Sequence, residues 1–212
     1  ELDLCHQEAV QNFFTSEKPE YVFLAAAKVG GIHANNSYPA EFIRDNLLIQ
    51  TNIIDSAYRN DCKKLLFLGS SCIYPKHCPQ PMKEEYLLTG PLEETNDAYS
   101  IAKIAGLKMC EYYSKSHKLN FKTLMPPNLY GPNDNFHPDN GHVIPALMTK
   151  FNNATTDTVT CWGDGTPTRE FMYVDDLADA CLFAVENYSD AELINVGSGQ
   201  DVSIFHLAHK IA

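Results

Sequence analysis

Tyr99 and Lys103 are the first pair of residues whose types and spacing could carry out chemistry. They lie four positions apart in a segment predicted to be helical, Ala98–Ser116, so their side chains share one face of the helix. An ammonium group beside a phenol lowers the pKa of the phenol, which can then protonate a carbonyl oxygen during reduction. In a chain with 11 tyrosines this spacing also arises by chance, and the alternative is a solvated helix face.

A serine at the end of a strand could serve the same carbonyl oxygen. The apolar run Lys64–Gly69 predicts a buried strand, and Ser70 and Ser71 follow it directly. A hydroxyl at this edge of a parallel sheet could hydrogen-bond the oxygen that the phenol protonates. Adjacent residues face opposite sides, so the residues alone leave the choice between Ser70 and Ser71 open.

The elements that must position these residues alternate between strand and helix. The predicted strands are Tyr21–Ala27, Lys64–Gly69 and Phe121–Leu124, and the helices between them are Pro39–Arg59 and Ala98–Ser116. Downstream, the pattern predicts helices at Ile144–Phe151, Val174–Glu186 and Ser203–Ala212, and a strand at Val159–Trp162. We therefore predict an α/β fold with a Rossmann-type doubly wound parallel sheet and a smaller lobe.

Composition limits the kind of partner. The 212 residues include 16 basic and 27 acidic residues, a formal net charge of −11, with no basic cluster to neutralise nucleic-acid phosphates or bind a membrane surface. The seven cysteines show no C-x-x-C pair or metal-ligand spacing, which favours free thiols in a reducing compartment and no metal site. We expect a cytoplasmic protein that binds a small molecule, with no nucleic-acid or membrane partner.

Five longer motifs point to a family. They are LAAAKVGGI (24–32), LGSSCIYP (68–75), NLYGPNDNFHP (128–138), GHVIPAL (141–147) and TREF (168–171). Together they resemble the GDP-L-fucose synthase family of the extended short-chain dehydrogenase/reductase superfamily. The resemblance implies an NADPH-dependent enzyme that epimerises C3 and C5 of GDP-4-keto-6-deoxy-D-mannose and then reduces C4 to give GDP-L-fucose.

The resemblance also assigns catalytic roles. Cys72 matches the family's epimerising base and His142 its acid, while Tyr99, Lys103 and Ser70 match the reducing group. A C4 ketone acidifies the neighbouring C–H groups, so inversion needs a base and an acid on opposite ring faces. The alternatives are that Cys72 is a small buried apolar residue and that His142 is structural.

Binding residues are implied in the same way. The expected cofactor contacts, for NADP(H), are Leu68, Gly69, Ser70, Ser71, Tyr99, Lys103, Pro126, Pro127, Asn128, Leu129 and His142. The expected substrate contacts are Lys150, Trp162 and Arg169, the arginine as a clamp on the diphosphate. Pro127 and Lys150 depart from the family, which carries threonine and, in bacteria, arginine there. Core packing is the alternative for Trp162.

The resemblance predicts that the sequence is a fragment. The chain has no G-x-x-G-x-x-G turn, and its opening residues Glu1–Leu4 resemble a segment after the family's third strand, so we expect roughly the first 55 to 60 residues, two strand-helix units, to be absent. We predict a partial NADP-binding domain at 1–130, to which 170–190 return, and a partial substrate lobe at 131–169 and 191–212. Activity belongs to the whole protein, and the fragment alone is expected to be inactive.

Two other functions fit part of the pattern. Another nucleotide-sugar epimerase or dehydratase of the superfamily would share Ser70, Tyr99 and Lys103 without requiring Cys72 and His142. A non-catalytic dinucleotide-binding scaffold would keep the fold without turnover. By analogy with the superfamily we also expect a homodimer, in which Pro39–Arg59 and Ala98–Ser116 form a four-helix bundle with their copies.

Overall fold

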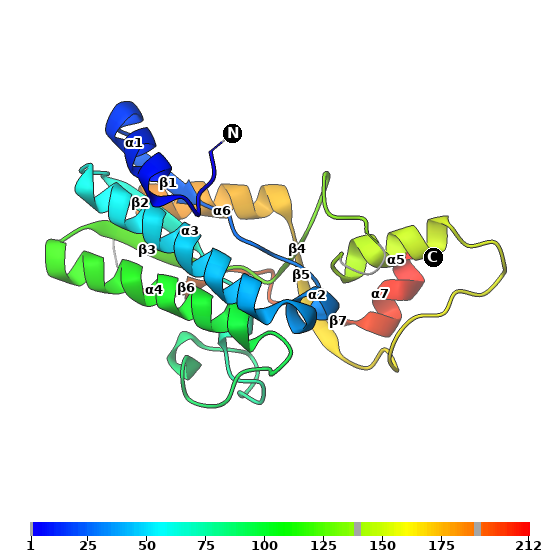
Figure 1. Cartoon of the computed structure of the whole chain (residues 1–212). Helices are drawn as coiled ribbons and strands as arrows, with labels where there is room; N and C mark the ends of the chain where they lie inside the picture. Colours follow the sequence, from blue (N-terminus) through cyan, green and yellow to red (C-terminus); the bar gives the residue numbers. More distant parts are fainter. Residues whose placement is uncertain (1, 138–140, 189–191) are drawn as a thin grey trace.

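Four short parallel strands form the centre of the fold (Figure 1). The computed structural model describes residues 2–137, 141–188 and 192–212, so Glu1 and Pro138 of the motifs above lie outside the described residues. The strands are β1 (Tyr21–Leu24), β2 (Lys64–Leu68), β3 (Asn120–Met125) and β6 (Leu193–Asn195), in the order β1-β2-β3-β6. Each neighbouring pair is parallel.

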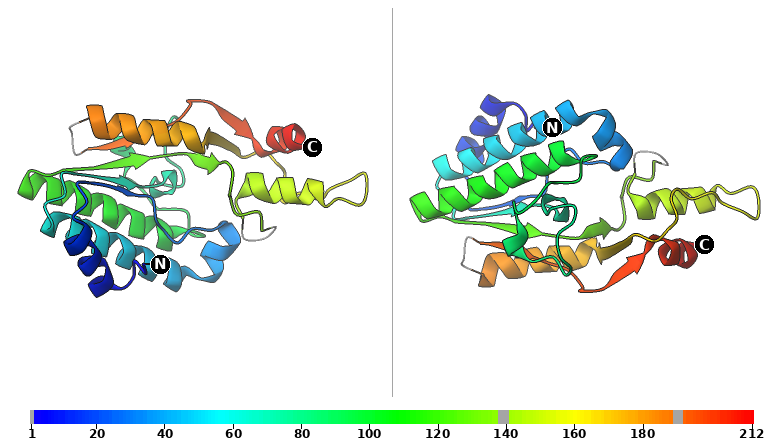
Figure 2. Two further views of the ribbon diagram at one scale, coloured as in Figure 1. Left: turned by 90° about the horizontal axis from the view of Figure 1, so that it is seen from above. Right: turned by 90° about the horizontal axis from the view of Figure 1, so that it is seen from below.

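Helices cover both faces of this sheet, as Figure 2 shows. On one face lie α3 (Pro39–Arg59) and α4 (Asp97–His117), with α1 (Gln7–Glu17) packed against α3. On the other face lies α6 (Val174–Asn187). Parallel sheets need cover on both faces, and this arrangement confirms the predicted doubly wound α/β fold.

The core consists of the residues that the sequence marks as continuous apolar runs. Leu65, Leu66 and Phe67 of β2 are all buried, as expected of a central strand with helices on both faces. On the α3/α4 side, Phe67 joins Ile54 and Phe121 in the larger core cluster, and Leu66 joins the cluster under α6.

Helices α3 and α4 approach each other closely because α4 carries a glycine at the crossing. A Cβ on Gly106 would lie 2.7 Å from both Gln50 Oε1 and Phe67 Cζ. The Gln50 amide, 3% exposed, donates to the Ala102 carbonyl at 2.6 Å. This contact fixes how α4 lies over the sheet, and therefore where Tyr99 and Lys103 point.

A second, smaller sheet lies beyond the carboxyl edge of the first (Figure 1). It contains β4 (Asn128–Tyr130), β5 (Thr168–Tyr173) and β7 (Asp201–Ser203), with β4 parallel and β7 antiparallel to β5. Helices α5 (Val143–Asn152) and α7 (Ile204–Ile211) pack against each other at the same end. Three short helices complete the elements: α2 (Ile32–Ser37), η1 (Ser71–Ile73) and η2 (Glu84–Tyr86).

Two sequence expectations need correction. The predicted strand Val159–Trp162 is irregular: no strand in the described part of the chain pairs with it, and the glycines at 163 and 165 turn the chain with φ of 78° and 75°. Residues 193–195, assigned above to the substrate lobe, form β6 and pair with β3 in the large sheet. The rest of the predicted division into two domains stays a prediction.

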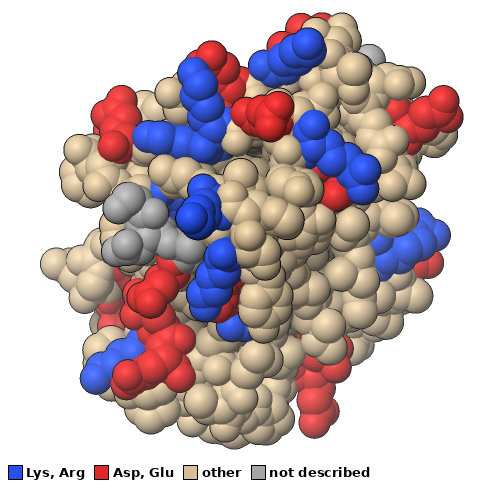
Figure 3. Space-filling model, turned by 90° about the vertical axis from the view of Figure 1, so that its left-hand side faces the viewer, with Lys and Arg blue, Asp and Glu red and all other residues tan. Residues whose placement is uncertain are grey.

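The surface is mixed in charge. On the face drawn in Figure 3, Lys and Arg side chains are interspersed with Asp and Glu. In the described part of the chain, no helix combines the length and the apolar character that crossing a membrane requires. Nor do the described residues contain a His, Cys, Asp and Glu cluster suited to a metal ion.

Candidate active site

A buried lysine lies at the carboxyl end of β2. Lys103, 3% exposed, donates from Nζ to the Leu68 carbonyl at 2.8 Å, and its ammonium lies 5.7 Å from the centre of the Tyr99 ring. Burial lowers the pKa of Lys103 to about 8, and the nearby Cys72 partly opposes this. The prediction that Tyr99 and Lys103 share a helix face is confirmed.

The electrostatic consequence predicted for Tyr99 is wrong. Burial raises the pKa of this phenol, a charge on Cys72 raises it further, and a hydrogen bond with Ser70 opposes the rise. Desolvation of the phenolate is the largest cause of this rise. Tyr99 therefore stays protonated at neutral pH, as a group that donates a proton to a carbonyl oxygen must be.

Cys72 completes the cluster from the 3₁₀ turn η1. Burial raises the pKa of the Cys72 thiol, while the neighbouring hydroxyls of Ser100 and Ser70 and the charge of Lys103 lower it. Ser70 influences the pKa of both Cys72 and Tyr99, which favours Ser70 over Ser71 as the serine of the cluster; its role stays a prediction. Sequence reasoning missed Ser100, although it directly follows Tyr99.

His142 is separate from this cluster. It is the exposed N-cap residue of α5, and no side-chain capping hydrogen bond is present. Within the described residues, no contact joins His142 to Cys72. Its role as the opposing acid stays a prediction.

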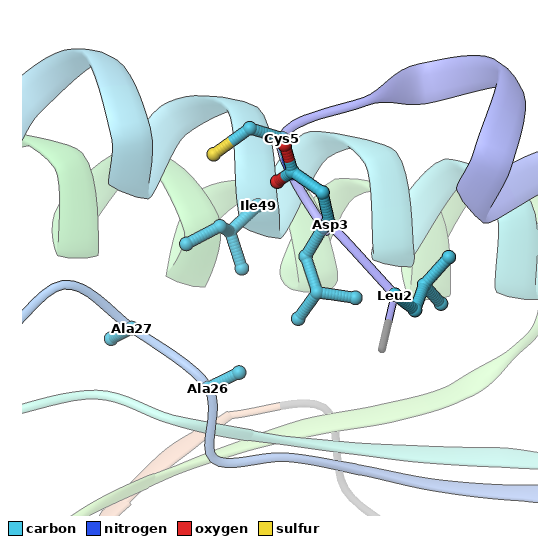
Figure 4. A pocket seen from close by; sticks show the side chains of 7 residues that line it. Leu2, Asp3, Cys5, Ala26, Ala27 and Ile49 are labelled. Carbon is cyan, nitrogen blue, oxygen red and sulfur yellow. The ribbon is translucent and has the colours of Figure 1, made fainter.

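A hollow lies at the carboxyl end of β1. It has a volume of about 530 Å³ and is lined by the N-terminal segment, the chain after β1 and one α3 residue: Leu2, Asp3, Leu4, Cys5, Ala26, Ala27 and Ile49 (Figure 4). The small side chains of Ala26 and Ala27 leave room for a ligand to approach the backbone, and the Asp3 carboxylate could accept from an adenine amine.

The chain after β1 is held in place by α3. The Lys28 backbone N–H donates to Asn46 Oδ1 at 2.9 Å, and the Asn46 amide returns a bond to the Lys28 carbonyl at 3.0 Å. Lys28 also forms an ion pair with Asp45 at 2.7 Å. Sequence reasoning could not select Asp45 or Asn46, because both bond to Lys28, which lies 17 and 18 positions away.

The remaining expected cofactor contacts surround the same edge of the sheet. The Gly69 backbone N–H donates to the Leu124 carbonyl at 2.9 Å, which extends the pairing of β2 with β3 past Leu68. Pro126 and Pro127 connect β3 to β4, where the Asn128 amide donates to the Glu170 carbonyl at 3.1 Å. Ser71 and Leu129 lie in η1 and β4.

Two of the three expected substrate residues lie together. Lys150 Nζ is 4.5 Å from the centre of the Trp162 ring, and Trp162 is 69% exposed, which argues against the core-packing alternative. Trp162 also lines a cavity of about 270 Å³ with Phe205 and His209. Arg169 is exposed on β5 and donates to its neighbour's carbonyl, with no described contact to either Lys150 or Trp162.

Comparison with known proteins gives the family. The model of the NAD dependent epimerase/dehydratase family matches residues 1–197. GDP-L-fucose synthase 1 of Arabidopsis thaliana is 60% identical over 214 residues, all of this chain and 66% of the relative. GDP-L-fucose synthase of Escherichia coli K12 is 53% identical over all of this chain and 70% of the relative.

Solved structures agree. A GDP-L-fucose synthetase from Naegleria fowleri bound to NADP superimposes with a TM-score of 0.90 at 32% identity, over 99% of this chain and 65% of that one. The chain thus spans about two thirds of the length of the relatives it matches, and the resemblance stated from the motifs is confirmed. The chain belongs to the NAD dependent epimerase/dehydratase family.

Proposed function

We propose that the whole protein converts GDP-4-keto-6-deoxy-D-mannose to GDP-L-fucose by epimerisation at C3 and C5 and reduction at C4. The observation that carries this is the clustering of Cys72 with Ser70, Tyr99 and Lys103 at the carboxyl edge of the sheet. A reductase alone needs the serine, tyrosine and lysine. A thiol within the same cluster adds a base that can act on the carbons beside the ketone.

In the epimerisation, the chain moves protons. The Cys72 thiolate takes the proton from the carbon beside the ketone, the electron pair passes to the carbonyl oxygen, and His142 returns a proton from the opposite face. Ser70 holds the oxygen on which charge develops.

In the reduction, Tyr99 donates the proton. Its raised pKa keeps the O–H intact until the C4 oxygen becomes basic, and Lys103 holds the site positive beside it. NADPH supplies a hydride to C4 when bound. The residues that would hold it include Asp3, Ala26 and Ala27, which line the hollow. The family resemblance adds Leu68, Gly69, Ser70, Ser71, Tyr99, Lys103, Pro126, Pro127, Asn128, Leu129 and His142.

The substrate's nucleotide fits the other lobe. Trp162 offers an exposed aromatic face at the 270 Å³ cavity, and the Lys150 ammonium lies over the same ring, where it could meet a phosphate. Arg169 would need a change of side-chain rotamer to reach the diphosphate, since it now bonds the Thr168 carbonyl.

The proposal includes the oligomeric state of the protein and its place in the cell. Leu48 on α3 and Ile101 and Tyr112 on α4 are 40%, 46% and 58% exposed on the outer face of the helix pair. A second copy packed on that face would bury them in a four-helix bundle, so we propose a cytoplasmic homodimer.

The test is an assay of the whole protein with GDP-4-keto-6-deoxy-D-mannose and NADPH, with the sugar product identified. GDP-L-fucose is the expected product. Consumption of NADPH with a D-configured product would favour another nucleotide-sugar enzyme of the superfamily, and tight NADPH binding without turnover would favour the scaffold.

The variant Cys72→Ser separates the two halves of the reaction. It should abolish deuterium exchange from solvent into C3 and C5 while NADPH still binds. Deuterium exchange that persists in this variant would show that Cys72 is not the base.

A further inference from the structure

The turn that carries Cys72 is too short to be held by its own hydrogen bonds. η1 has three residues, and the backbone N–H groups of Ile73 and Tyr74 donate to the carbonyls of Ser70 and Ser71 at 3.2 and 3.3 Å. The hydrogen-bond geometry of a 3₁₀ turn is poor, so such a turn is weakly stabilised from within. The side chains that follow Cys72 must therefore fix it against the rest of the protein.

These side chains supply one apolar contact and one polar contact. Ile73 and Tyr74 are both buried in the larger core cluster. The Tyr74 hydroxyl donates to Asn195 Oδ1 at 2.6 Å. A buried tyrosine usually keeps its hydroxyl hydrogen-bonded, and here the partner lies 121 positions away, at the end of β6. The polar contact of the turn is thus made with the large sheet itself.

Asn195 also binds the segment between η1 and α4. Its side-chain amide donates to the Met82 carbonyl at 3.1 Å, and its backbone N–H donates to Glu84 Oε1 at 2.8 Å. The next N–H, that of Val196, bonds to the Met125 carbonyl of β3, so the Asn195 N–H faces the outer edge of β6. No strand of the described chain pairs with that edge, and Glu84 accepts the bond that a strand would accept.

The two side-chain bonds of Asn195 fix its amide in one orientation. The oxygen of an amide can only accept and its nitrogen can only donate, and here each atom has its own partner, the Tyr74 hydroxyl and the Met82 carbonyl. A rotation of the Asn195 side chain would break both bonds. The place of Cys72, two residues before Tyr74, therefore depends on a residue of β6.

We infer that Asn195 is a positioning residue, which holds the η1 turn, and with it Cys72, through the Tyr74 hydroxyl. The need for a fixed thiol rests on the proposed function, because a base must lie within reach of the proton that it removes. No hydrogen bond joins Asn195 to Cys72 or Tyr99 in the described residues, so Asn195 acts through Tyr74. When this bond is lost, the turn should open more often and expose the thiol.

The test measures how fast the Cys72 thiol is alkylated. The whole protein is treated with iodoacetamide, and the peptide that contains Cys72 is followed by mass spectrometry. Tyr74→Phe keeps the ring and removes only the hydroxyl, so it should raise the rate about three- to tenfold, the effect of one lost hydrogen bond on local opening. Asn195→Ala should raise the rate at least as much. The double variant should match Asn195→Ala alone, because both changes break the same bond.

Two controls distinguish the turn from the whole fold. Tyr113→Phe also removes a tyrosine hydroxyl, one that donates to Asp55 Oδ1 at 3.0 Å near the C-terminal end of α4, and it should leave the Cys72 rate unchanged. Cys110 is buried in the same core cluster as Tyr74 and reports unfolding of the whole chain. Its alkylation rate should stay at the wild-type value in every variant.

Three results would overturn the inference: an unchanged Cys72 rate in Tyr74→Phe, an equal rise in Tyr113→Phe, and fully additive effects in the double variant. A rise at Cys110 that matches the rise at Cys72 would also overturn it, because the bond would then stabilise the whole fold and not the turn. If Asn195→Ala does not fold, Tyr74→Phe and its control still decide.

The alkylation rates do not depend on the proposed reaction. If the wild type neither exchanges C3 and C5 protons nor oxidises NADPH, the proposed function fails, while the alkylation rates still decide the role of Asn195. If the wild type is active, Tyr74→Phe should lower kcat for deuterium exchange at C3 and C5 and leave KM for the sugar unchanged, since only the base has lost its position. A change confined to KM would contradict the positioning role.

Discussion

Lys103 is a charged side chain that the fold has placed almost entirely out of water. The charge is stabilised because the ammonium donates to the Leu68 carbonyl and lies near the aromatic rings of Phe67 and Tyr99. Burial nevertheless depresses its pKa to about 8, well below the ordinary value of lysine. The cost of holding this charge should therefore be visible in the stability of the protein.

We predict that this cost is relieved as pH rises from about 8 toward 10.5. In that window the unfolded lysine still carries its proton and the folded one does not, so the free energy of unfolding rises with pH. Relative to Lys103→Met, the wild type should gain about 1–2 kcal/mol between pH near 7.5 and 9.5, measured by urea unfolding.

The comparison with Lys103→Met removes the opposing contributions of Cys72 and Tyr99, whose raised pKa values make the folded state lose stability at alkaline pH. Lys115→Met, an exposed lysine of α4, should show no such gain. An equal response of the wild type and Lys103→Met would show that Lys103 keeps an ordinary pKa.

Tyr99→Phe should separate reduction from epimerisation. Loss of the phenolic proton donor should slow NADPH oxidation by about 10²–10⁴-fold, whereas Cys72 still exchanges C3 and C5 protons. The measurement pairs NADPH absorbance with deuterium incorporation into the sugar. Loss of both in a folded variant would mean that Tyr99 is needed before the first proton transfer.

For single residues, the spacing in the sequence could predict which side chains form the cluster, but it could not predict their pKa values. Tyr99 and Lys103 meet because they share a helix, and Ser70 and Cys72 because they end the neighbouring strand. The raised pKa of Tyr99 depends on how deeply α4 lies against the sheet, which no local pattern records. Ser100 was missed for the same reason.

The contact between α3 and α4 determines how the site is built. Gly106 lets the helices approach, and Gln50 bonds across them to the Ala102 carbonyl. In an exposed helix, replacing glycine with alanine would stabilise by about 1 kcal/mol. At Gly106 the added methyl group meets Gln50 and Phe67 at 2.7 Å.

We therefore predict that Gly106→Ala destabilises the protein by about 1–3 kcal/mol, since the cost of overpacking exceeds the gain in helix propensity. Thermal or urea unfolding measures the change. Ser116→Ala, at an exposed position of the same helix, should be neutral or slightly stabilising. A stabilised Gly106→Ala would show that the two helices can separate freely.

The two longest helices and the central strands were predictable, whereas helix α1 and the three-residue strands were not. The 21-residue helices α3 and α4 have enough repeats to show their period, and β2 is a continuous apolar run. Strands β4, β6 and β7 have three residues each and exist because distant segments pair with them. Val159–Trp162 has the residues of a strand, but within the described residues no other strand pairs with it, and it stays irregular.

For the whole molecule, the outer face of α3 and α4 is the surface to test. Ile101 lies in the first turns of α4 and is 46% exposed. If the proposed dimer forms there, Ile101→Glu places one carboxylate from each copy in an apolar interface, which should separate the two chains. The mass measured by analytical ultracentrifugation should then halve. Leu88→Glu, an exposed apolar residue on the loop after η2, should leave the mass unchanged.

A wild-type mass equal to one chain would exclude the dimer, and an undiminished mass in Ile101→Glu would place the contact elsewhere. The sequence could suggest this surface only by analogy, because helical periodicity separates buried from outward positions without saying what covers the outward ones.

The serine that influences both Cys72 and Tyr99 has a consequence for the charge of the cluster. A negative charge on Cys72 raises the pKa of Tyr99, and the single proton of Ser70 can support only one of them at a time. Because burial already keeps the phenol protonated and a thiolate only strengthens this, the cluster should hold one anion at a time: an ionised Cys72 beside a neutral Tyr99, and not both charges together.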